Sequence, residues 1–244
     1  MRTAAVIQAR MGSERLPGKV LQDISGKPMI DRVVERVARC KSLDGVIVAT
    51  STNTADDVLA SHCRDLGVPV VRGSENDVLS RYALAAEKYH CETIVRITSD
   101  CPLVDPEIID QVVTEVTENP GVQYACNFFP QRLFPRGLDA EALTVRALQQ
   151  INQQATDPRH REHVTLMIYE NASRFNIASV SNRLDHSHLR WTVDTEADLM
   201  LVRKIYEHFA EQAVESFGYA ETMRALTQNW HWCQINREVL QKAA

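Results

Sequence analysis

Short apolar runs alternate with segments of helical periodicity throughout the first half of the chain. The runs at 46–50 and 93–98 are rich in Val, Ile and Thr, which is typical of buried strands. Apolar residues recur three or four positions apart over 30–38, 55–66 and 76–89, which predicts amphipathic helices. This alternation predicts successive βαβ units, and therefore a mostly parallel sheet with helices on both faces.

The second half of the chain has a weaker pattern. Strands are expected at 123–127 and 137–144, around a loop rich in Phe and Pro, and helical spacing returns at 160–170. Two further strands are expected at 175–180 and 189–194. The predicted sheet is therefore mixed, with its less regular strands contributed by the second half.

Local signals mark where two of the later helices begin. Asp105 precedes Pro106, and proline is well tolerated at the first helical position. Thr195 and Asp198 have the spacing of a capping box at the start of a strongly amphipathic segment. Because no linker rich in Pro, Gly or Ser divides the chain, we expect residues 1–244 to form a single α/β domain.

Composition and charge limit the classes of partner. The chain has 27 Lys and Arg against 32 Asp and Glu, a formal net charge of −5, which does not favour a nucleic-acid partner. No apolar run is long enough to span a membrane, and no signal-peptide pattern is present, so we expect a cytoplasmic protein. The six cysteines are scattered singly, which indicates buried free thiols instead of a zinc or redox site.

The loop after the first apolar run concentrates positive charge in this acidic chain. It carries Arg10, Arg15 and Lys19 together with Gly12 and Gly18, but not in the Walker A or Rossmann spacing. Backbone N–H groups of such a loop can meet phosphate oxygens, and the cations add charge-assisted hydrogen bonds. We interpret it as a phosphate-binding loop, with a solvated surface loop as the alternative.

Four motifs occur in the order found in a known enzyme family. They are the segment 8–19 with Gly26-Lys27-Pro28-Met29, followed by 72–79, 98–103 and 191–195. Together they resemble the sugar-acid cytidylyltransferases, and within them the branch of the spore-coat polysaccharide biosynthesis protein F type. The resemblance spans nearly the whole chain and implies a fold like that of the nucleotide-diphospho-sugar transferases.

The resemblance implies binding of CTP. Gln8 and Ala9 would lie near the cytosine and ribose, and the loop cations would contact the triphosphate. The complete set of expected nucleotide-binding residues is Gln8, Ala9, Arg10, Gly12, Ser13, Arg15, Lys19, Arg81 and Asp100. Of these, Arg10, Lys19 and Asp100 are expected to be catalytic.

By the same resemblance, Asp100 and Asp194 would hold Mg²⁺. Each stands at the end of a predicted buried strand, so their carboxylates can converge on one cation at the carboxyl edge of the sheet. The implied reaction is in-line attack by an acceptor oxygen on the α-phosphorus of CTP, which releases pyrophosphate. It requires positioning and charge neutralisation but no protein nucleophile.

The acceptor is expected to be an anionic sugar acid of the octulosonate or nonulosonate type, or a related small metabolite. Residues 123–190 are the expected acceptor and dimerisation region, and the family implies a homodimer. The residues expected to contact the acceptor are Asn127, Arg136, Asp139, Glu141, Arg161 and His163. The chain departs from the octulosonate enzymes in having Ser99-Asp100-Cys101-Pro102 where they have a Gly-Asp-Glu-Pro pattern, which leaves the acceptor sugar open.

Two other functions are compatible with parts of the sequence. A glycosyltransferase of the related nucleotide-sugar fold would normally carry an Asp-x-Asp metal motif, whereas Ser99-Asp100-Cys101 contains one carboxylate. A catalytically silent nucleotide-binding partner in polysaccharide assembly has no obvious need for both Asp100 and Asp194. These alternatives differ from the cytidylyltransferase in whether pyrophosphate is released.

Overall fold

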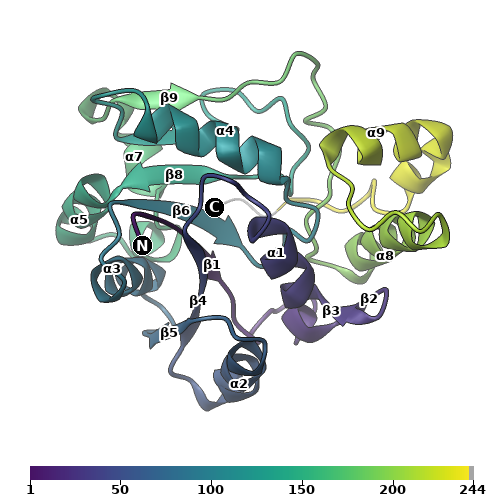
Figure 1. The fold of residues 1–244 in the computed structure, drawn as a ribbon, viewed down its shortest axis with the longest axis horizontal. Coiled ribbons are helices and arrows are strands. Elements are labelled where there is room, and N and C mark those ends of the chain that lie inside the picture. The colour runs from purple at the N-terminus through teal and green to yellow at the C-terminus, as the bar shows by residue number, and fades with distance from the viewer. Residues whose placement is uncertain (242–244) are drawn as a thin grey trace.

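A seven-stranded sheet runs through the computed structural model, which describes residues 1–241 (Figure 1). Its strands lie in the order β5-β4-β1-β6-β8-β7-β9. In chain order they are β1 (Thr3–Gln8), β4 (Gly45–Ser51), β5 (Val70–Gly73), β6 (Thr93–Thr98), β7 (Tyr124–Cys126), β8 (Glu141–Thr144) and β9 (Ile177–Ser179). Only β8, among these seven, is antiparallel to both of its neighbours, which confirms the predicted mixed and mostly parallel sheet.

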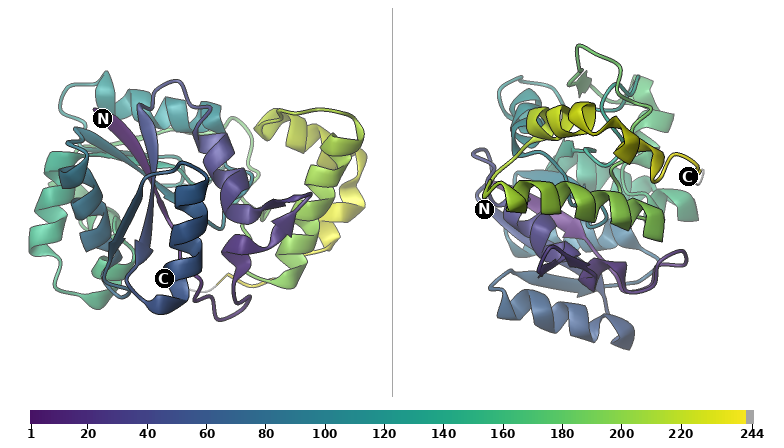
Figure 2. Two further views of the ribbon diagram at one scale, coloured as in Figure 1. Left: turned by 60° about the horizontal axis from the view of Figure 1, so that its bottom comes forward. Right: turned by 90° about the vertical axis from the view of Figure 1, so that its right-hand side faces the viewer.

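Helices cover both faces of this sheet (Figures 1 and 2). They are α1 (Met29–Val37), α2 (Asp57–Asp65), α3 (Val78–Lys88), α4 (Pro106–Thr117), α5 (Val145–Gln154), α6 (Pro158–Glu162), α7 (Leu166–Glu170), α8 (Glu196–Glu211) and α9 (Tyr219–Gln228). The core on one face includes side chains of α1, α2, α4, α8 and α9, and the core on the other includes those of α3, α5 and α7. A small hairpin of β2 (Asp23–Ile24) and β3 (Lys27–Pro28) precedes α1.

The residues of β1 explain why both faces are covered. Ala4 and Val6 pack into one core and Ala5 and Ile7 into the other, and all four have no exposed surface. A strand that is apolar on both faces is stable only when helices shield both. β1 pairs in register with β6, with Gln8 opposite Thr98, so the loops that follow these two strands leave the same edge of the sheet.

The helix caps agree with the sequence signals. The side chain of Asp105 accepts hydrogen bonds from the first turn of α4, and Thr195 and Asp198 form the complete capping box of α8. Asp77 caps α3 in the same way, through the backbone N–H of Ser80. These polar caps satisfy N–H groups that have no partner within the helix.

Three predicted elements differ from the structure. The strand expected at 189–194 is an extended segment with one isolated bridge, between Arg136 and Arg190, and the strand expected at 137–144 shrinks to β8. The helix expected at 160–170 is divided into α6 and α7, because Val164 between them has φ 51°, outside the helical region. The helix α5 was not predicted, since its polar Gln and Asn residues obscure the apolar positions Ala147, Leu148 and Ile151.

Within residues 1–241, none of the helices has both the length and the apolar character that crossing a lipid bilayer requires.

Candidate functional site

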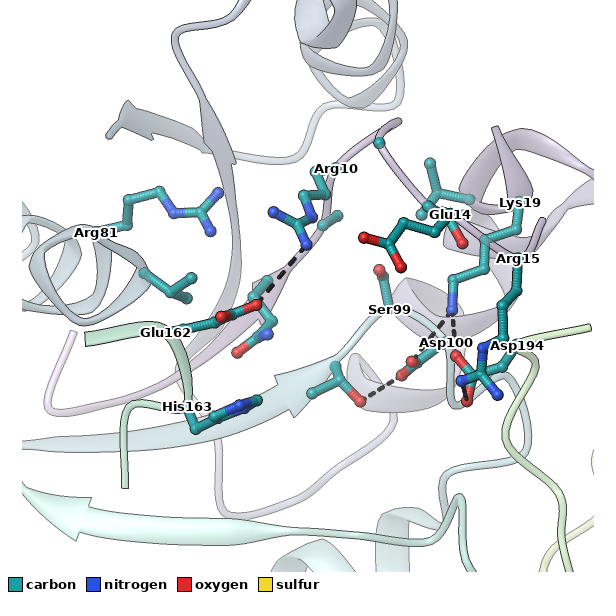
Figure 3. Close-up of a pocket in the computed structure, with 17 residues that line it drawn as sticks. Arg10, Glu14, Arg15, Lys19, Arg81, Ser99, Asp100, Glu162, His163 and Asp194 are labelled. Carbon is teal, nitrogen blue, oxygen red and sulfur yellow. Dashed lines mark hydrogen bonds and ion pairs between the residues drawn. The ribbon is translucent and has the colours of Figure 1, made fainter. Parts of the chain in front are cut away.

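A cavity of about 360 Å³ opens at the edge of the sheet where β1 and β6 end (Figure 3). Gln8 and Thr98, the paired last residues of the two strands, both line it. The complete lining is Gln8, Ala9, Arg10, Gly12, Ser13, Glu14, Arg15, Lys19, Val20, Val78, Arg81, Thr98, Ser99, Asp100, Glu162, His163 and Asp194. The structure thus brings together all nine expected nucleotide-binding residues and both expected metal ligands.

The loop after β1 is held in a folded shape by its own backbone and by one buried carboxylate. The N–H of Gly18 donates to the carbonyl of Met11 at 3.1 Å, which turns the chain back on itself. Gly18 has φ 68°, a conformation that favours glycine. Asp56 accepts a hydrogen bond from the N–H of Met11 at 2.7 Å, so the start of the loop is tied to the segment after β4. Arg10, Arg15 and Lys19 therefore project from a loop of defined geometry.

Lys19 joins the two predicted metal ligands. Its Nζ lies 2.8 Å from Asp194 Oδ1 and 3.3 Å from Asp100 Oδ2, and it also donates to the carbonyl of Val193 at 2.7 Å. Asp194 in addition pairs with Arg15 at 2.8 Å and with Arg190 at 2.6 Å. One end of the cavity is thus a compact cluster of alternating charges (Figure 3).

The charges of this cluster stabilise one another. Burial alone disfavours the ammonium form of Lys19, but the Asp100 and Asp194 carboxylates outweigh it and raise the pKa of Lys19 above its ordinary value. Burial acts against ionisation of Asp194 too, and the neighbouring Lys19, Arg190 and Arg15 hold its pKa below the usual range. At neutral pH both groups are therefore ionised, as a site for a charged ligand requires.

The donor set of Asp100 and Asp194 fits a hard divalent cation. Carboxylate oxygens are the ligands that Mg²⁺ prefers, and Asp100 is oriented by the hydroxyl of Thr98, which donates to its Oδ1 at 2.6 Å. Residues 1–241 contain no group of three or more His, Cys, Asp or Glu placed to hold a metal. Two carboxylates supplemented by substrate phosphates and water are nevertheless a common arrangement for Mg²⁺.

The opposite end of the cavity contains a buried arginine with unused donors. Arg81 on α3 is 2% exposed, and its Nε and Nη1 have no hydrogen-bond partner. Its side chain passes over Gly73, where a Cβ would lie 2.9 Å from Arg81 Cγ, and it extends toward Arg10 (Figure 3). Burial lowers the pKa of Arg81, although an arginine remains charged at neutral pH. A buried cation with unpaired N–H groups is costly unless a ligand accepts from them.

The expected acceptor residues are distributed differently. Of the six, only His163 lines the cavity, and its burial lowers its pKa so that the neutral imidazole is favoured. Arg161 is outside the cavity lining, where it pairs with Asp77 and donates to the carbonyl of Asn152 at 2.8 Å.

The other four expected acceptor residues have protein partners or lie outside the cavity lining. Asn127 is 1% exposed and bridges backbone groups of Leu138 and Ala140. Glu141 is 2% exposed and pairs with Arg96.

Asp139 pairs with Arg132, and Arg136 stands in the same partly buried loop. This loop approaches Trp191 and Thr192 so closely at Gly137 that a Cβ there would lie 2.4 Å from the Thr192 nitrogen. The Thr192 hydroxyl in turn donates to the carbonyl of Asp100 at 3.1 Å. Arg136 and Asp139 therefore belong to a loop that packs against the segment in contact with Asp100.

The lining includes six residues to which the sequence assigned no individual role: Glu14, Val20, Val78, Thr98, Ser99 and Glu162. Thr98 and Ser99 stand directly before Asp100, so the motif that contains Asp100 could have indicated them. Glu162 faces the cavity, with its Oε1 3.9 Å from Arg10 Nη2 across the opening.

Comparison with known proteins agrees with this geometry. The family model for cytidylyltransferases matches residues 4–236. An uncharacterized protein of Methanocaldococcus jannaschii is 36% identical over 211 residues, 86% of this chain and 85% of its own length. The spore coat polysaccharide biosynthesis protein SpsF of Bacillus subtilis is 33% identical over 215 residues, 85% of this chain and 87% of its own length.

Solved structures give the same result. A cytidylyltransferase from Leptospira borgpetersenii serovar Hardjo-bovis matches with a TM-score of 0.90 and 32% identity, over 100% of both chains. The CMP:2-keto-3-deoxy-manno-octonic acid synthetase in complex with CTP matches with a TM-score of 0.66 over 85% of this chain and 99% of its own. At 23% identity, this second likeness concerns the fold.

Proposed function

The chain belongs to the cytidylyltransferase family of CTP-dependent nucleotidyltransferases, and we propose that it transfers CMP from CTP to an anionic sugar acid with release of pyrophosphate. The observation that carries the proposal is the cavity at the ends of β1 and β6. One end holds Lys19, Arg15 and two carboxylates, and the other holds Arg81 with unpaired donors. A nucleoside triphosphate has an anionic triphosphate that fits the first end and a base with hydrogen-bond acceptors that fits the second.

The loop after β1 is the proposed triphosphate site. Arg10, Arg15 and Lys19 supply three cations, and Ser13 and Gly12 supply a hydroxyl and a closely approachable backbone. Arginine binds phosphate oxygens in a bidentate manner, whereas lysine provides a point charge. Because Lys19 and Arg15 already pair with Asp194, binding would redistribute these cations between the carboxylate and the phosphates.

Asp100 and Asp194 are the proposed Mg²⁺ ligands. The ion, when bound, would neutralise phosphate charge and thereby favour attack at phosphorus. Thr98 keeps the Asp100 carboxylate oriented, and Lys19 holds the two carboxylates close together. The chain's own residues would thus supply orientation and electrostatic stabilisation.

The proposed reaction is a single displacement. An acceptor oxygen forms a bond to the α-phosphorus of CTP, and the bond from that phosphorus to the oxygen that bridges it to the β-phosphorus breaks. The electron pair of the broken bond leaves with pyrophosphate, whose charge Lys19 and Arg15 can stabilise, and the acceptor hydroxyl proton passes to solvent. His163 is neutral at neutral pH, so it can accept a hydrogen bond from a substrate hydroxyl.

We further propose that the acceptor enters from residues 123–190, that the enzyme acts as a homodimer, and that it works in the cytoplasm. Glu162 and His163 are the residues of this region that line the cavity, and Arg136 and Asp139 lie near Cys101, which follows Asp100. The six cysteines are all unpaired thiols, which persist in reducing compartments. Light scattering on the purified protein tests the dimer.

Pyrophosphate release is the direct test of the activity. The enzyme with Mg²⁺ is incubated with CTP, UTP, ATP or GTP and a panel of octulosonic, nonulosonic and smaller anionic acceptors. We expect release only with CTP and one acceptor class. Release from another nucleotide but never from CTP would overturn the assigned base, and transfer of a sugar from a nucleotide sugar without pyrophosphate would support a glycosyltransferase instead.

A further inference from the structure

Gln8, at the end of β1, has a side-chain amide that is oriented by hydrogen bonds to two neighbouring side chains. Its Oε1 lies 3.2 Å from Nε of Arg96 and 3.1 Å from the hydroxyl of Tyr82. A guanidinium only donates hydrogen bonds, so the amide atom that faces Arg96 must be the oxygen. The amide NH₂ is then the part left for the cavity that Gln8 lines, and no residue within 1–241 accepts a hydrogen bond from it.

Arg96 is itself held by a buried network. It pairs with Glu141, whose other oxygen accepts hydrogen bonds from the hydroxyls of Tyr124, at 2.6 Å, and Thr165. Glu141 is 2% exposed, and Tyr124 is fully buried. This network joins β6, β8, β7 and the turn before α7, and it holds Arg96 beside Gln8.

Arg81, another polar side chain that lines the cavity, also carries hydrogen-bond donors. Arg81 is on α3 next to Tyr82, and its Nε and Nη1 have no partner. Arg81, whose unpaired Nε and Nη1 are buried, and the NH₂ of Gln8 both lie at the end of the cavity away from Asp100 and Asp194. Cytosine has two adjacent acceptors, O2 and N3, whereas N3 of uracil carries a hydrogen and would face these donors with another donor.

We infer that Arg96 is a positioning residue that fixes Gln8 with its NH₂ toward the nucleobase, and that this selects cytosine over uracil. The inference rests on the proposed function and adds to it the residues that decide the base. Glu141, expected to contact the acceptor, acts here through Arg96. A site built to donate to a ligand atom rejects the analogue whose atom cannot accept.

The first test removes the positioning group without touching the ligand. Arg96→Met frees the Gln8 amide to rotate, so calorimetric titration should show the ratio of UTP to CTP dissociation constants falling by about tenfold or more. Arg96→Lys retains a donor and should restore most of the preference. Arg36→Met removes another buried arginine, which donates to the carbonyls of Val104 and Phe217 and does not line the cavity, and should lower the melting temperature without changing the ratio.

A second variant keeps the test informative if Arg96→Met does not fold. Gln8→Glu has nearly the same shape and keeps an oxygen toward Arg96, but replaces the donating NH₂ with an oxygen. We expect CTP affinity to fall by about tenfold or more while the melting temperature is maintained by the stronger pair with Arg96. Tyr82→Phe, which removes only a hydroxyl, should weaken the preference less.

The outcomes separate this inference from the proposed function. If the native enzyme releases pyrophosphate from CTP but Arg96→Met leaves the ratio of UTP to CTP dissociation constants unchanged, the inference is wrong and the function stands. Where Arg96→Met does not fold, unchanged CTP affinity in Gln8→Glu together with an unchanged ratio in Tyr82→Phe has the same meaning. If no nucleotide is consumed, the proposed function fails. A lost preference in Arg96→Met that Arg36→Met does not reproduce supports the inference.

Discussion

The ammonium group of Lys19 lies 2.8 Å from the carboxylate of Asp194, at the position where a cation would compensate that carboxylate and its neighbour Asp100. A protein cation therefore stabilises the two carboxylates before any ligand arrives. The same ammonium is a natural partner for a phosphate. The proposed binding of a metal and the proposed binding of a nucleotide would therefore be linked through one side chain.

Lys19→Met should separate these two effects. The variant loses a charge-assisted contact worth about 1.5–3 kcal/mol, so CTP affinity should fall by about 10- to 100-fold. Its two carboxylates lose a counter-charge, so binding of Mn²⁺ in the absence of nucleotide should become tighter. Calorimetry and electron paramagnetic resonance measure the two affinities. Lys27→Met, which removes an exposed partner of Glu35, is the control, and unchanged Mn²⁺ affinity in Lys19→Met would contradict the linkage.

Asp100→Asn should reduce turnover far more than CTP binding. The amide keeps the size of the side chain and the contact with Thr98, but it removes the negative charge expected to hold Mg²⁺. We expect kcat to fall by about 100-fold or more and the CTP dissociation constant to change by less than about threefold. Steady-state kinetics and calorimetry give the two values. Asp65→Asn, at an exposed helix end, should be silent, and equal losses in kcat and affinity would show a purely binding role.

Glu141→Gln should destabilise the protein strongly. The change leaves the Arg96 guanidinium buried without its counter-charge, which costs about 3–5 kcal/mol when one partner of a buried pair is removed. Urea denaturation measures this loss. Glu92→Gln breaks the exposed pair with Arg2 and should cost less than about 1 kcal/mol. Similar losses in the two variants would mean that the buried pair is not a structural element.

Acidification should weaken the fold through His163. Burial depresses its pKa below the ordinary value of 6.5, so the unfolded chain binds the proton more readily than the folded protein does. The stability that His163 contributes is therefore complete above pH 6.5 and is lost as the pH falls through the folded pKa. The free energy of unfolding should decrease more between pH 7 and pH 5 in the native protein than in His163→Gln. An NMR titration midpoint for His163 at or above 6.5 would contradict this.

Local patterns in the sequence predicted the site residues that directly follow a strand. The loop 8–19 and Asp100 follow strands β1 and β6, whose apolar runs are unmistakable, and both reach the cavity. Asp194 also reaches the cavity, but not as the end of a strand. The backbone N–H of Val193 donates to the carbonyl of Asp100 at 2.8 Å, a tertiary contact that no spacing in the sequence indicates.

The second half was harder to predict because its elements depend on distant partners. From the sequence we expect Glu141 to be an exposed residue that contacts the acceptor. In the structure it is buried and pairs with Arg96, which lies 45 positions earlier in the chain. Val164 interrupts a helical pattern by adopting a positive φ, which the apolar spacing does not reveal. Roles for Asn127, Arg136, Asp139 and Arg161 at the acceptor remain predictions.

The contact between Lys19 and Asp194 spans 175 positions, which has a consequence for synthesis on the ribosome. At about 5–20 residues per second, roughly 10–35 s separate the emergence of the two side chains. During that interval the proposed phosphate-binding loop exists without Asp194, which pairs with both Lys19 and Arg15 in the folded protein. Until Asp194 has been made, Asp100 is the carboxylate available to pair with Lys19, and Arg15 lacks the carboxylate that it pairs with in the folded protein.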